Sequence, residues 1–239
     1  MIPLHDDNPT RIRPVVTVGL IAACVVVFLW QVSLGEAGYR RAVYALGFVP
    51  AVLFGEAALP PGLAVVPPVM TLLTSMFLHG GLWHLAGNML YLWIFGNNVE
   101  DAMGHGRFVA FYLVSGLAAA LAQALADPGS TVPMIGASGA VSGVLGAYLL
   151  LYPHARVLVL IPLGFFSQLV RVPAVWVLGL WFLIQIVSSL AAEPGRGGVA
   201  WYAHIGGFVA GMVLIPLFKR RDVPLFHDPA RDRRGGGWS

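Results

Sequence analysis

The sequence predicts an all-α membrane protein, a bundle of six transmembrane helices with a long interfacial loop between the first and second helices. Of the 239 residues, 58% are hydrophobic and only 10% are charged, whereas a soluble globular domain has about 25% charged residues. Six apolar runs follow one another along the chain, and the basic residues gather near their ends. Such a pattern is typical of a chain that crosses a bilayer several times.

The first apolar run, residues 14–34, holds about twenty nearly uncharged residues, enough to cross a hydrocarbon core of about 30 Å. It is too long for the core of a signal peptide, and no clear small-residue cleavage site follows it, so we expect it to stay in the protein. Residues 35–80 then form a long connection with a Pro-rich stretch and several apolar patches. We expect this loop to lie partly in the membrane interface.

The segment 156–171 lies between the fourth and fifth predicted spans and is apolar. It is bracketed by arginines and interrupted by Pro162 and Gly164, so we interpret it as a surface-lying connection, with a seventh span as the less favoured alternative. The five spans predicted after the first are residues 81–99, 106–126, 138–152, 173–191 and 200–218.

Six spans place both termini on the same side of the membrane. Eleven of the 14 Lys and Arg residues fall on that side, so the positive-inside rule predicts cytoplasmic termini for a multi-pass protein of the cell membrane. The chain then divides into a cytoplasmic segment (1–13), a six-helix membrane domain (14–218) and a cytoplasmic tail (219–239) that we expect to be disordered. The net charge of +3 reflects this orientation and indicates no nucleic-acid partner. The single cysteine excludes an intramolecular disulfide.

A short stretch at residues 135–143 places Ser138 among glycines and alanines at the start of the fourth span. Small residues at spacings of three and four are typical of close helix packing in membranes, which is one interpretation of this stretch. The other is a site for a nucleophile. Four polar residues in or beside other spans favour the second interpretation: His79, His84, Asn88 and His204.

The polar residues fall at similar depths in the predicted bundle. Ser138 and His204 each precede the cytoplasmic end of their span by fourteen residues, which puts both about 21 Å from that end. By the same rise, Asn88 lies at about 18 Å and His84 at about 24 Å. Polar residues in lipid are costly and usually face an interior or a water-filled cavity. We therefore predict one shared site, less than about 10 Å beneath the outer boundary.

The residue types suit nucleophilic catalysis. His204 is the candidate base for Ser138, because histidine is the side chain that titrates nearest neutrality. No Asp or Glu lies at matching depth in any span, so the sequence predicts a dyad rather than a triad. The oxyanion would be held by the Ser138 backbone N–H, the Asn88 amide and a ring nitrogen of His84.

Other chemistries fit the chain less well. There is no His-Glu-x-x-His motif, which disfavours a zinc protease, and there are no paired aspartates inside spans. A metal site made of His79, His84 and His204 is a minor alternative, and we expect neither a metal nor a cofactor. Taken singly, each histidine or Asn88 could also be a satisfied polar residue of a helix bundle.

Over nearly all of residues 14–218 the chain resembles the rhomboid intramembrane serine proteases. The motifs that carry the resemblance are Gly136-Ala137-Ser138-Gly139, Ala203-His204-Ile205-Gly206-Gly207, and the order and spacing of His79, His84 and Asn88. The resemblance implies a serine endopeptidase in the lipid bilayer that cleaves transmembrane protein substrates in or near their spans. It further implies roles for five residues: nucleophile Ser138, base His204, oxyanion-hole residues His84 and Asn88, and a supporting His79 near the water-accessible opening.

Two positions depart from the pattern of the family. Some rhomboids carry an aromatic residue four positions after the nucleophile, against which the catalytic histidine packs, and this chain has Ser142 there. We expect Trp201 or Tyr202 to orient His204 instead. The loop before the second span has Val69-Met70-Thr71 where many members have a Trp-Arg pair.

Two other classes of function are kept as alternatives. A catalytically inactive rhomboid-like protein that binds membrane clients would most simply lack the serine or the histidine, and both are present. A transporter would favour internal repeat symmetry and interrupted helices in both halves. The chain has no evident repeat, which disfavours that interpretation.

Overall fold

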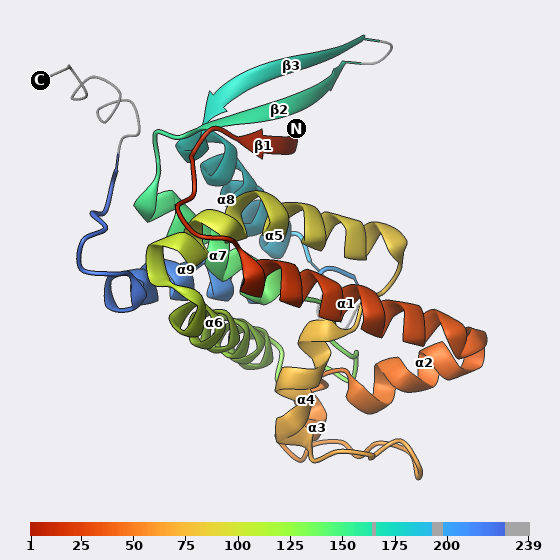
Figure 1. Cartoon of the computed structure of the whole chain (residues 1–239). Helices are drawn as coiled ribbons and strands as arrows, with labels where there is room; N and C mark the ends of the chain where they lie inside the picture. Colours follow the sequence, from red (N-terminus) through yellow and green to blue (C-terminus); the bar gives the residue numbers. More distant parts are fainter. Residues whose placement is uncertain (164–165, 193–197, 228–239) are drawn as a thin grey trace, which may run out of the picture.

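The computed structural model describes residues 1–163, 166–192 and 198–227, which are mostly helical with one small sheet (Figure 1). The elements in chain order are β1 (Ile2–Asp6), α1 (Val15–Ser33), α2 (Gly35–Leu46), α3 (Pro50–Leu53), α4 (Pro68–Thr74), the 3-10 turn η1 (Ser75–Phe77), α5 (Leu82–Met103), α6 (His105–Ala126), α7 (Ser138–Leu151), β2 (Arg156–Leu163), β3 (Phe166–Pro173), α8 (Ala174–Leu190) and α9 (Trp201–Phe218).

Six of the helices coincide with the six predicted spans, within a few residues at each end. Three of them, α1, α6 and α9, are long and apolar enough to cross a membrane. Two others, α7 and α8, are shorter apolar helices of 14 and 17 residues. The prediction of a mostly helical membrane protein with several candidate spans is confirmed.

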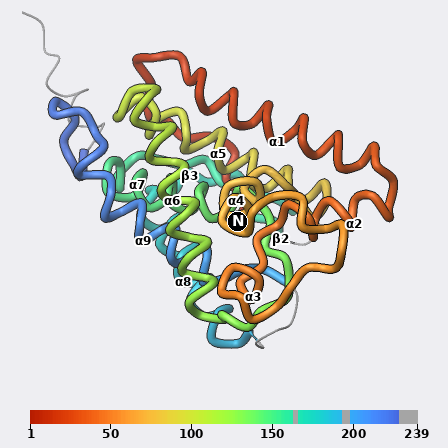
Figure 2. The backbone as a smooth tube through the Cα atoms, turned by 90° about the horizontal axis from the view of Figure 1, so that it is seen from below, coloured from red at the N-terminus to blue at the C-terminus, as the bar shows by residue number. Residues whose placement is uncertain are grey.

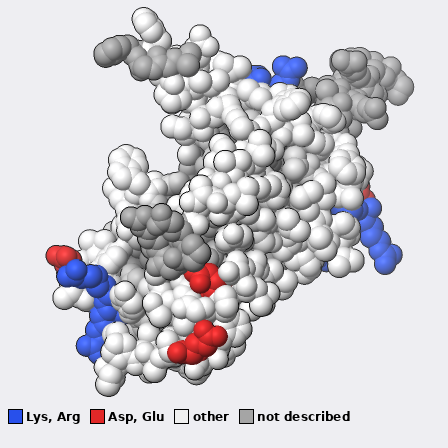
Figure 3. All heavy atoms as spheres, turned by 180° about the vertical axis from the view of Figure 1, so that it is seen from behind, with Lys and Arg blue, Asp and Glu red and all other residues white. Residues whose placement is uncertain are grey.

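The surface also suits a lipid environment. On the face drawn in Figure 3, charged side chains leave a broad expanse free of Lys, Arg, Asp and Glu. On α8, the side chains of Trp176, Leu183 and Leu190 are 69%, 54% and 81% exposed. An apolar row of this kind needs a partner that excludes water, and the acyl chains of a bilayer provide one.

The centre of the bundle is the contact between α7 and α9, with α6 packed against both. A side chain at Gly207 of α9 would collide with the carbonyl oxygen of Gly139 of α7, and one at Gly211 would collide with that of Gly143. The two backbones therefore touch, as glycines in membrane helices allow. This contact fixes the depth of each helix against the other and positions the residues of their first turns.

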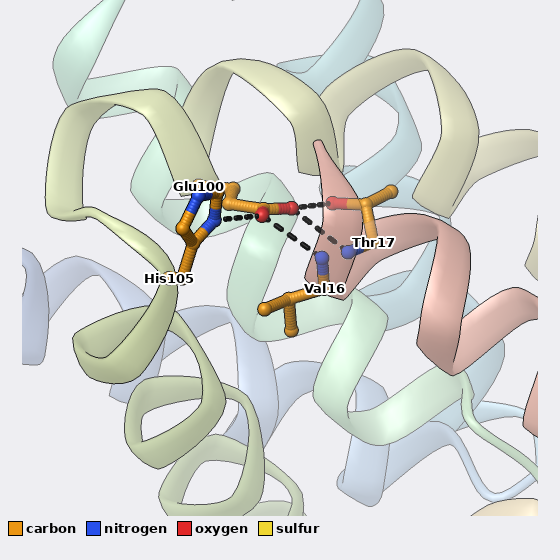
Figure 4. A network of polar contacts seen from close by, with 4 residues as sticks. All are labelled: Val16, Thr17, Glu100 and His105. Carbon is orange, nitrogen blue, oxygen red and sulfur yellow. Dashed lines mark hydrogen bonds and ion pairs between the residues drawn. The ribbon is translucent and has the colours of Figure 1, made fainter. Parts of the chain in front are cut away.

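The beginning of α1 is capped by a side chain from α5. Pro14 precedes the helix, and α1 makes no side-chain cap of its own. The fully buried carboxylate of Glu100 accepts hydrogen bonds from the N–H groups of Val16 and Thr17 at 2.9 and 2.8 Å, and from the Thr17 hydroxyl at 2.7 Å (Figure 4). The ring of His105, at the start of α6, lies 2.6 Å from the same carboxylate. The Glu100 carboxylate thus satisfies two backbone N–H groups in the first turn of α1 and joins three helices.

The segment interpreted as a surface-lying connection forms the hairpin of β2 and β3. This hairpin departs from the all-α prediction, and it also departs from the alternative that the segment is a seventh span. β2 pairs antiparallel with β3 along the length of both strands, and β1 pairs with the other edge of β2. Val157 and Val159 of β2 are fully buried, but Leu158 and Leu160, which alternate with them, are also apolar. The alternation that marks a strand is hidden in a continuous apolar run.

The predicted tail, residues 219–239, is ordered in its first part. The backbone N–H groups of Arg220 and Phe226 donate to carbonyl oxygens at the ends of α5 and α7, at 2.8 and 2.7 Å. These bonds attach the chain as far as His227 to the bundle, which departs from the expected disorder. Residues 228–239 lie outside the described part of the chain.

The connection at residues 35–80 contains α2, α3, α4 and η1. Helix α2 packs beside the end of α1, and α3 and α4 pack against α6 (Figures 1 and 2). The hydroxyl of Thr74 donates to the carbonyl of Leu46 at 2.6 Å, which ties the end of α4 to the end of α2. The loop thus forms a wall on one side of the bundle, next to the cavity described below.

Candidate active site

Ser138 is the first residue of α7, and the chain enters that helix through Gly136. Gly136 has φ +123°, a conformation that residues with side chains rarely adopt. Its N–H donates to the carbonyl of Ser75 at 2.9 Å, and a Cβ built on it would lie 2.7 Å from Nε2 of His84. Only glycine therefore lets the backbone pass over His84 and place Ser138 at the helix N-terminus, where backbone N–H groups lack intrahelical partners.

His204 lies in the first turn of α9 and faces Ser138. Its Nε2 is 2.8 Å from the Ser138 hydroxyl oxygen, a good hydrogen-bond distance. The sequence analysis placed the two residues at equal depth, about 21 Å from the cytoplasmic ends of their spans. The structure brings them together, because α7 and α9 touch at Gly139, directly after Ser138, and at Gly207, about one turn after His204.

The side of the His204 ring that carries Nδ1 contacts α8. Nδ1 of His204 is 2.8 Å from the side-chain oxygen of Gln185, and the ring of Trp181 lies 5.9 Å away, tilted by 34°. Trp201, expected from the sequence, is near the histidine with ring centroids 6.2 Å apart and planes at 87°. Tyr202, the other expected aromatic, is 39% exposed.

Ser142, which stands where some rhomboids carry an aromatic residue, forms a hydrogen bond to the backbone of its own helix. Its hydroxyl donates to the carbonyl oxygen of Ser138 at 2.6 Å. The sequence analysis missed Gln185 and Trp181, although they gave a weak signal. They are four residues apart in an apolar run, so they share a helix face and can contact the same residue of a neighbouring helix.

His84 and Asn88 lie on one face of α5, beneath Gly136. The backbone N–H of Gly80 donates to Nδ1 of His84 at 3.2 Å, so a neutral His84 carries its proton on Nε2, on the side of Gly136. Asn88 is 8% exposed, and its side-chain nitrogen has no hydrogen-bond partner among the described residues. Both side chains therefore offer a donor at the entrance to α7, next to Ser138.

His79 lies apart from the opening that the resemblance implied for it. The residue is fully buried, its N–H donates to Gln31 of α1 at 3.0 Å, and its carbonyl accepts a bond from the Tyr39 hydroxyl of α2. Its ring packs edge-on against His84 at 5.2 Å. The anchors from α1 and α2 hold it in the protein interior, where its ring packs against that of His84.

A cavity of about 660 Å³ connects these groups. Its lining includes the polar residues Ser138, His204, His84 and Asn88, and its walls come from the loop before α5, from α6, from the segment before α7 and from the start of α9. Within the described residues, no group of three His, Cys, Asp or Glu side chains is arranged to hold a metal ion. The cavity has the size of a ligand pocket and a few convergent polar groups.

Known proteins share most of this chain. A family model described as the Rhomboid domain matches residues 67–221. The chain is 32% identical over 192 residues to Rhomboid protein 1, mitochondrial, of Saccharomyces cerevisiae, covering 73% of this chain and 52% of that protein. It is 36% identical over 143 residues to Rhomboid protease GluP of Bacillus subtilis, covering 60% and 25% of the two chains.

A mammalian relative is similar at the same level. The Presenilin-associated rhomboid-like protein, mitochondrial, of Mus musculus is 33% identical over 183 residues, covering 70% of this chain and 45% of that protein. The chain thus spans about half or less of the length of these curated relatives. The family model covers well over half of this chain and contains the four helices that carry Ser138, His204, His84, Asn88 and Gln185, which are α5, α7, α8 and α9. The chain therefore belongs to the rhomboid family.

Proposed function

We propose that the chain is an intramembrane serine endopeptidase that cleaves transmembrane proteins with the dyad of Ser138 and His204. The observation that carries the proposal is the 2.8 Å contact between Nε2 of His204 and the Ser138 hydroxyl. A serine hydroxyl is a weak nucleophile until a base removes its proton. Among the side chains that line the cavity, His204 is the one in direct contact with that hydroxyl.

The proposed reaction has two halves. In the first, Nε2 of His204 takes the Ser138 proton as the hydroxyl oxygen attacks the substrate carbonyl, and then returns a proton to the leaving amine. In the second, His204 takes a proton from water, which attacks the acyl-enzyme ester and releases the new carboxyl end and free Ser138. This is the logic of serine hydrolases, with each proton returned at the end of the cycle.

The proposed oxyanion hole lies at the entrance to α7. The Ser138 N–H is at a helix N-terminus, where partial positive charge favours an anion. The unpartnered amide of Asn88 and the Nε2 proton of His84 lie beside it, because both flank Gly136. Donors held in position before the reaction stabilise the developing charge without having to reorganise.

The membrane arrangement is part of the proposal. Helices α1, α5, α6, α7, α8 and α9 would form six spans of a membrane domain at residues 14–218, with both termini in the cytoplasm and α2 to α4 in the outer interface. Ser138 would then lie less than about 10 Å beneath the outer boundary of a cell membrane. Substrates would be cut in the outer portion of their spans, after local unwinding that exposes the scissile carbonyl.

The proposal is tested with a fluorophosphonate, which reacts covalently with an activated serine. The protein in detergent should be labelled, the Ser138→Ala variant should not, and the His204→Ala variant should be labelled much more slowly. A matched control is Ser142→Ala, four residues along α7, which should be labelled like the parent protein. Equal labelling of the parent and Ser138→Ala would contradict the proposed nucleophile. Absence of labelling in a folded parent protein would favour an inactive, client-binding member of the family.

A further inference from the structure

We infer that Gln185 of α8 is a positioning residue that fixes both the tautomer and the orientation of His204. The inference rests on the proposed function, because it assigns a role toward the proposed base. Gln185 is 4% exposed and contacts His204 on the side of Nδ1, but it is not itself among the residues that line the cavity. It acts through His204 rather than on the substrate.

The side-chain amide of Gln185 is held in one orientation by its own helix. Its nitrogen donates to the backbone carbonyl of Trp181 at 3.0 Å. A carbonyl oxygen can only accept a hydrogen bond, so the amide nitrogen must be the atom that faces Trp181. The amide oxygen is therefore the atom that faces Nδ1 of His204, at 2.8 Å.

This orientation determines where the imidazole carries its proton. An amide oxygen can only accept, so Nδ1 of His204 must be the protonated nitrogen. Nε2 then has a free lone pair, and it is the atom 2.8 Å from the Ser138 hydroxyl. The chain of contacts from Trp181 through Gln185 and His204 to Ser138 thus selects the one neutral tautomer that can accept the serine proton. The opposite tautomer would present an N–H to Ser138 and could not act as its base.

The same contacts fix the plane of the ring. The hydrogen bond from Nδ1 holds one edge of the imidazole, and the ring centroid of Trp181 lies 5.9 Å from that of His204, with the planes tilted by 34°. Both anchors come from successive turns of α8. Trp181 and Gln185 of α8 therefore hold the ring of His204 in place of an aromatic side chain at position 142.

A neutral amide suits a site within a membrane. The corresponding carboxylate of a serine protease triad would have to be buried beside His204 as a charge, which is costly in a medium of low dielectric constant. Glutamine supplies the acceptor without the charge. It orients the base and makes a smaller electrostatic contribution to the imidazolium than a carboxylate would.

The test compares three variants by steady-state cleavage of a model transmembrane substrate in liposomes. Gln185→Leu removes the acceptor at similar volume, and we expect kcat to fall roughly 10- to 100-fold, the size of effect known for metal-binding histidines that lose the partner orienting them. KM should change little, because Gln185 is not among the residues that line the cavity. Gln185→Glu restores an acceptor at the same place and should recover most of the lost kcat. It should also move the acidic limb of the pH dependence of kcat/KM to higher pH, because a carboxylate favours the protonated imidazole.

The matched control is Ser189→Ala, one turn further along α8. Ser189 is 5% exposed and donates to the carbonyl of Ile186 at 2.8 Å, so the change also deletes a buried polar group but leaves His204 untouched. Its kinetic constants should match those of the parent. Thermal unfolding of every variant separates loss of folding from loss of positioning.

The outcomes distinguish this inference from the proposed function. A parent protein whose Ser138 is labelled, with an unchanged kcat in Gln185→Leu, would overturn the role of Gln185 alone. A kcat lowered equally in the Leu and Glu variants, with no displacement of the pH profile, would make Gln185 a packing residue and also overturn it. Absence of Ser138 labelling in the folded parent would contradict the proposed function, whatever Gln185 does.

Discussion

The carbonyl oxygen of Gly139 in α7 occupies the place where a side chain on Gly207 of α9 would begin. The two helices carry Ser138 and His204 in their first turns, so the contact below the dyad sets the separation of its members. A methyl group at this point must push the backbones apart. The geometry of the proposed catalytic pair thus depends on the absence of a Cβ atom at Gly207, about one turn from His204.

We therefore predict that Gly207→Ala lowers both stability and activity. Overpacking of a tight contact costs about 1–3 kcal/mol, and here the obstacle is a backbone that cannot rotate away. The midpoint of thermal unfolding and the rate of cleavage should both fall. The control is Gly179→Ala on α8, where an added Cβ has no neighbour within 4 Å. That change should be neutral or raise stability by up to about 1 kcal/mol, and a similar loss in both variants would contradict the packing argument.

Asn88→Ala should lower turnover without eliminating it. The Ser138 N–H and His84 would still face the oxyanion, and loss of one such donor costs about 2.7–4 kcal/mol in a soluble serine protease. We expect an effect of that size or smaller on kcat, measured with a transmembrane substrate. Asn97→Ala is the control, because it removes an amide from the same helix about two and a half turns further on. An unchanged kcat in Asn88→Ala would assign Asn88 to helix packing.

Thr17→Val should destabilise the fold but leave the chemistry intact. The variant keeps the shape of the side chain and deletes the 2.7 Å bond from the Thr17 hydroxyl to the buried Glu100 carboxylate. A hydrogen bond to a charged group contributes about 1.5–3 kcal/mol. Thermal unfolding should report a loss of that size, whereas kcat below the unfolding range should stay near the parent value. The exposed Thr131→Val serves as control, and an equal effect there would refute the role given to Glu100.

Stability should depend on pH through Asp6 of β1. Its carboxyl is 3% exposed, and the Tyr148 hydroxyl of α7 donates to it at 2.6 Å. Burial raises the pKa of Asp6 from 3.8 to about 6, against the opposing effects of the Tyr148 bond and of His5. Because the pKa of Asp6 is higher in the folded protein than in the unfolded one, protonated Asp6 contributes to the stability of the fold. This contribution is fully present below pH 3.8 and is lost as pH rises through about 6.

The measurement is limited proteolysis of the N-terminal strand at pH 4.5 and 7.5, together with thermal unfolding. The free energy of unfolding should decrease by at most about 3 kcal/mol from the low-pH limit to the high-pH limit. Asp6→Asn should flatten the pH dependence, whereas Asp7→Asn, next to it in the chain, should keep it. Identical pH dependence in the parent and Asp6→Asn would show that another group is responsible.

The helices and the convergence of the site could be predicted from residue spacing. Long apolar runs bounded by charges determine where helices begin and end in a membrane. The small residues at Gly139, Gly143, Gly207 and Gly211 indicate which two helices touch. Depth then follows from counting residues, since the rise per residue of a helix is constant. This arithmetic gave Ser138 and His204 the same depth before any contact was known.

Other features could not be predicted because they depend on long-range contacts. The contact of Gln185 with His204 requires the rotation of α8 about its own axis, and α8 has apolar residues on all sides. The burial of His79 depends on Gln31 and Tyr39, which belong to a different part of the chain. β2 pairs with β1 from the beginning of the chain, and the apolar run at residues 157–163 suits a strand as well as a surface segment.

The pairing of β1 with β2 has a consequence for the order of assembly during synthesis. His5 lies opposite Leu158 in the sheet, and the helices α1, α5, α6 and α7 lie between them in the chain. When the ribosome has made β1, its partner strand does not yet exist. The first strand therefore stays unpaired while the chain from α1 to α7 is made. The sheet joins the beginning of the chain to helices that are synthesised before β2.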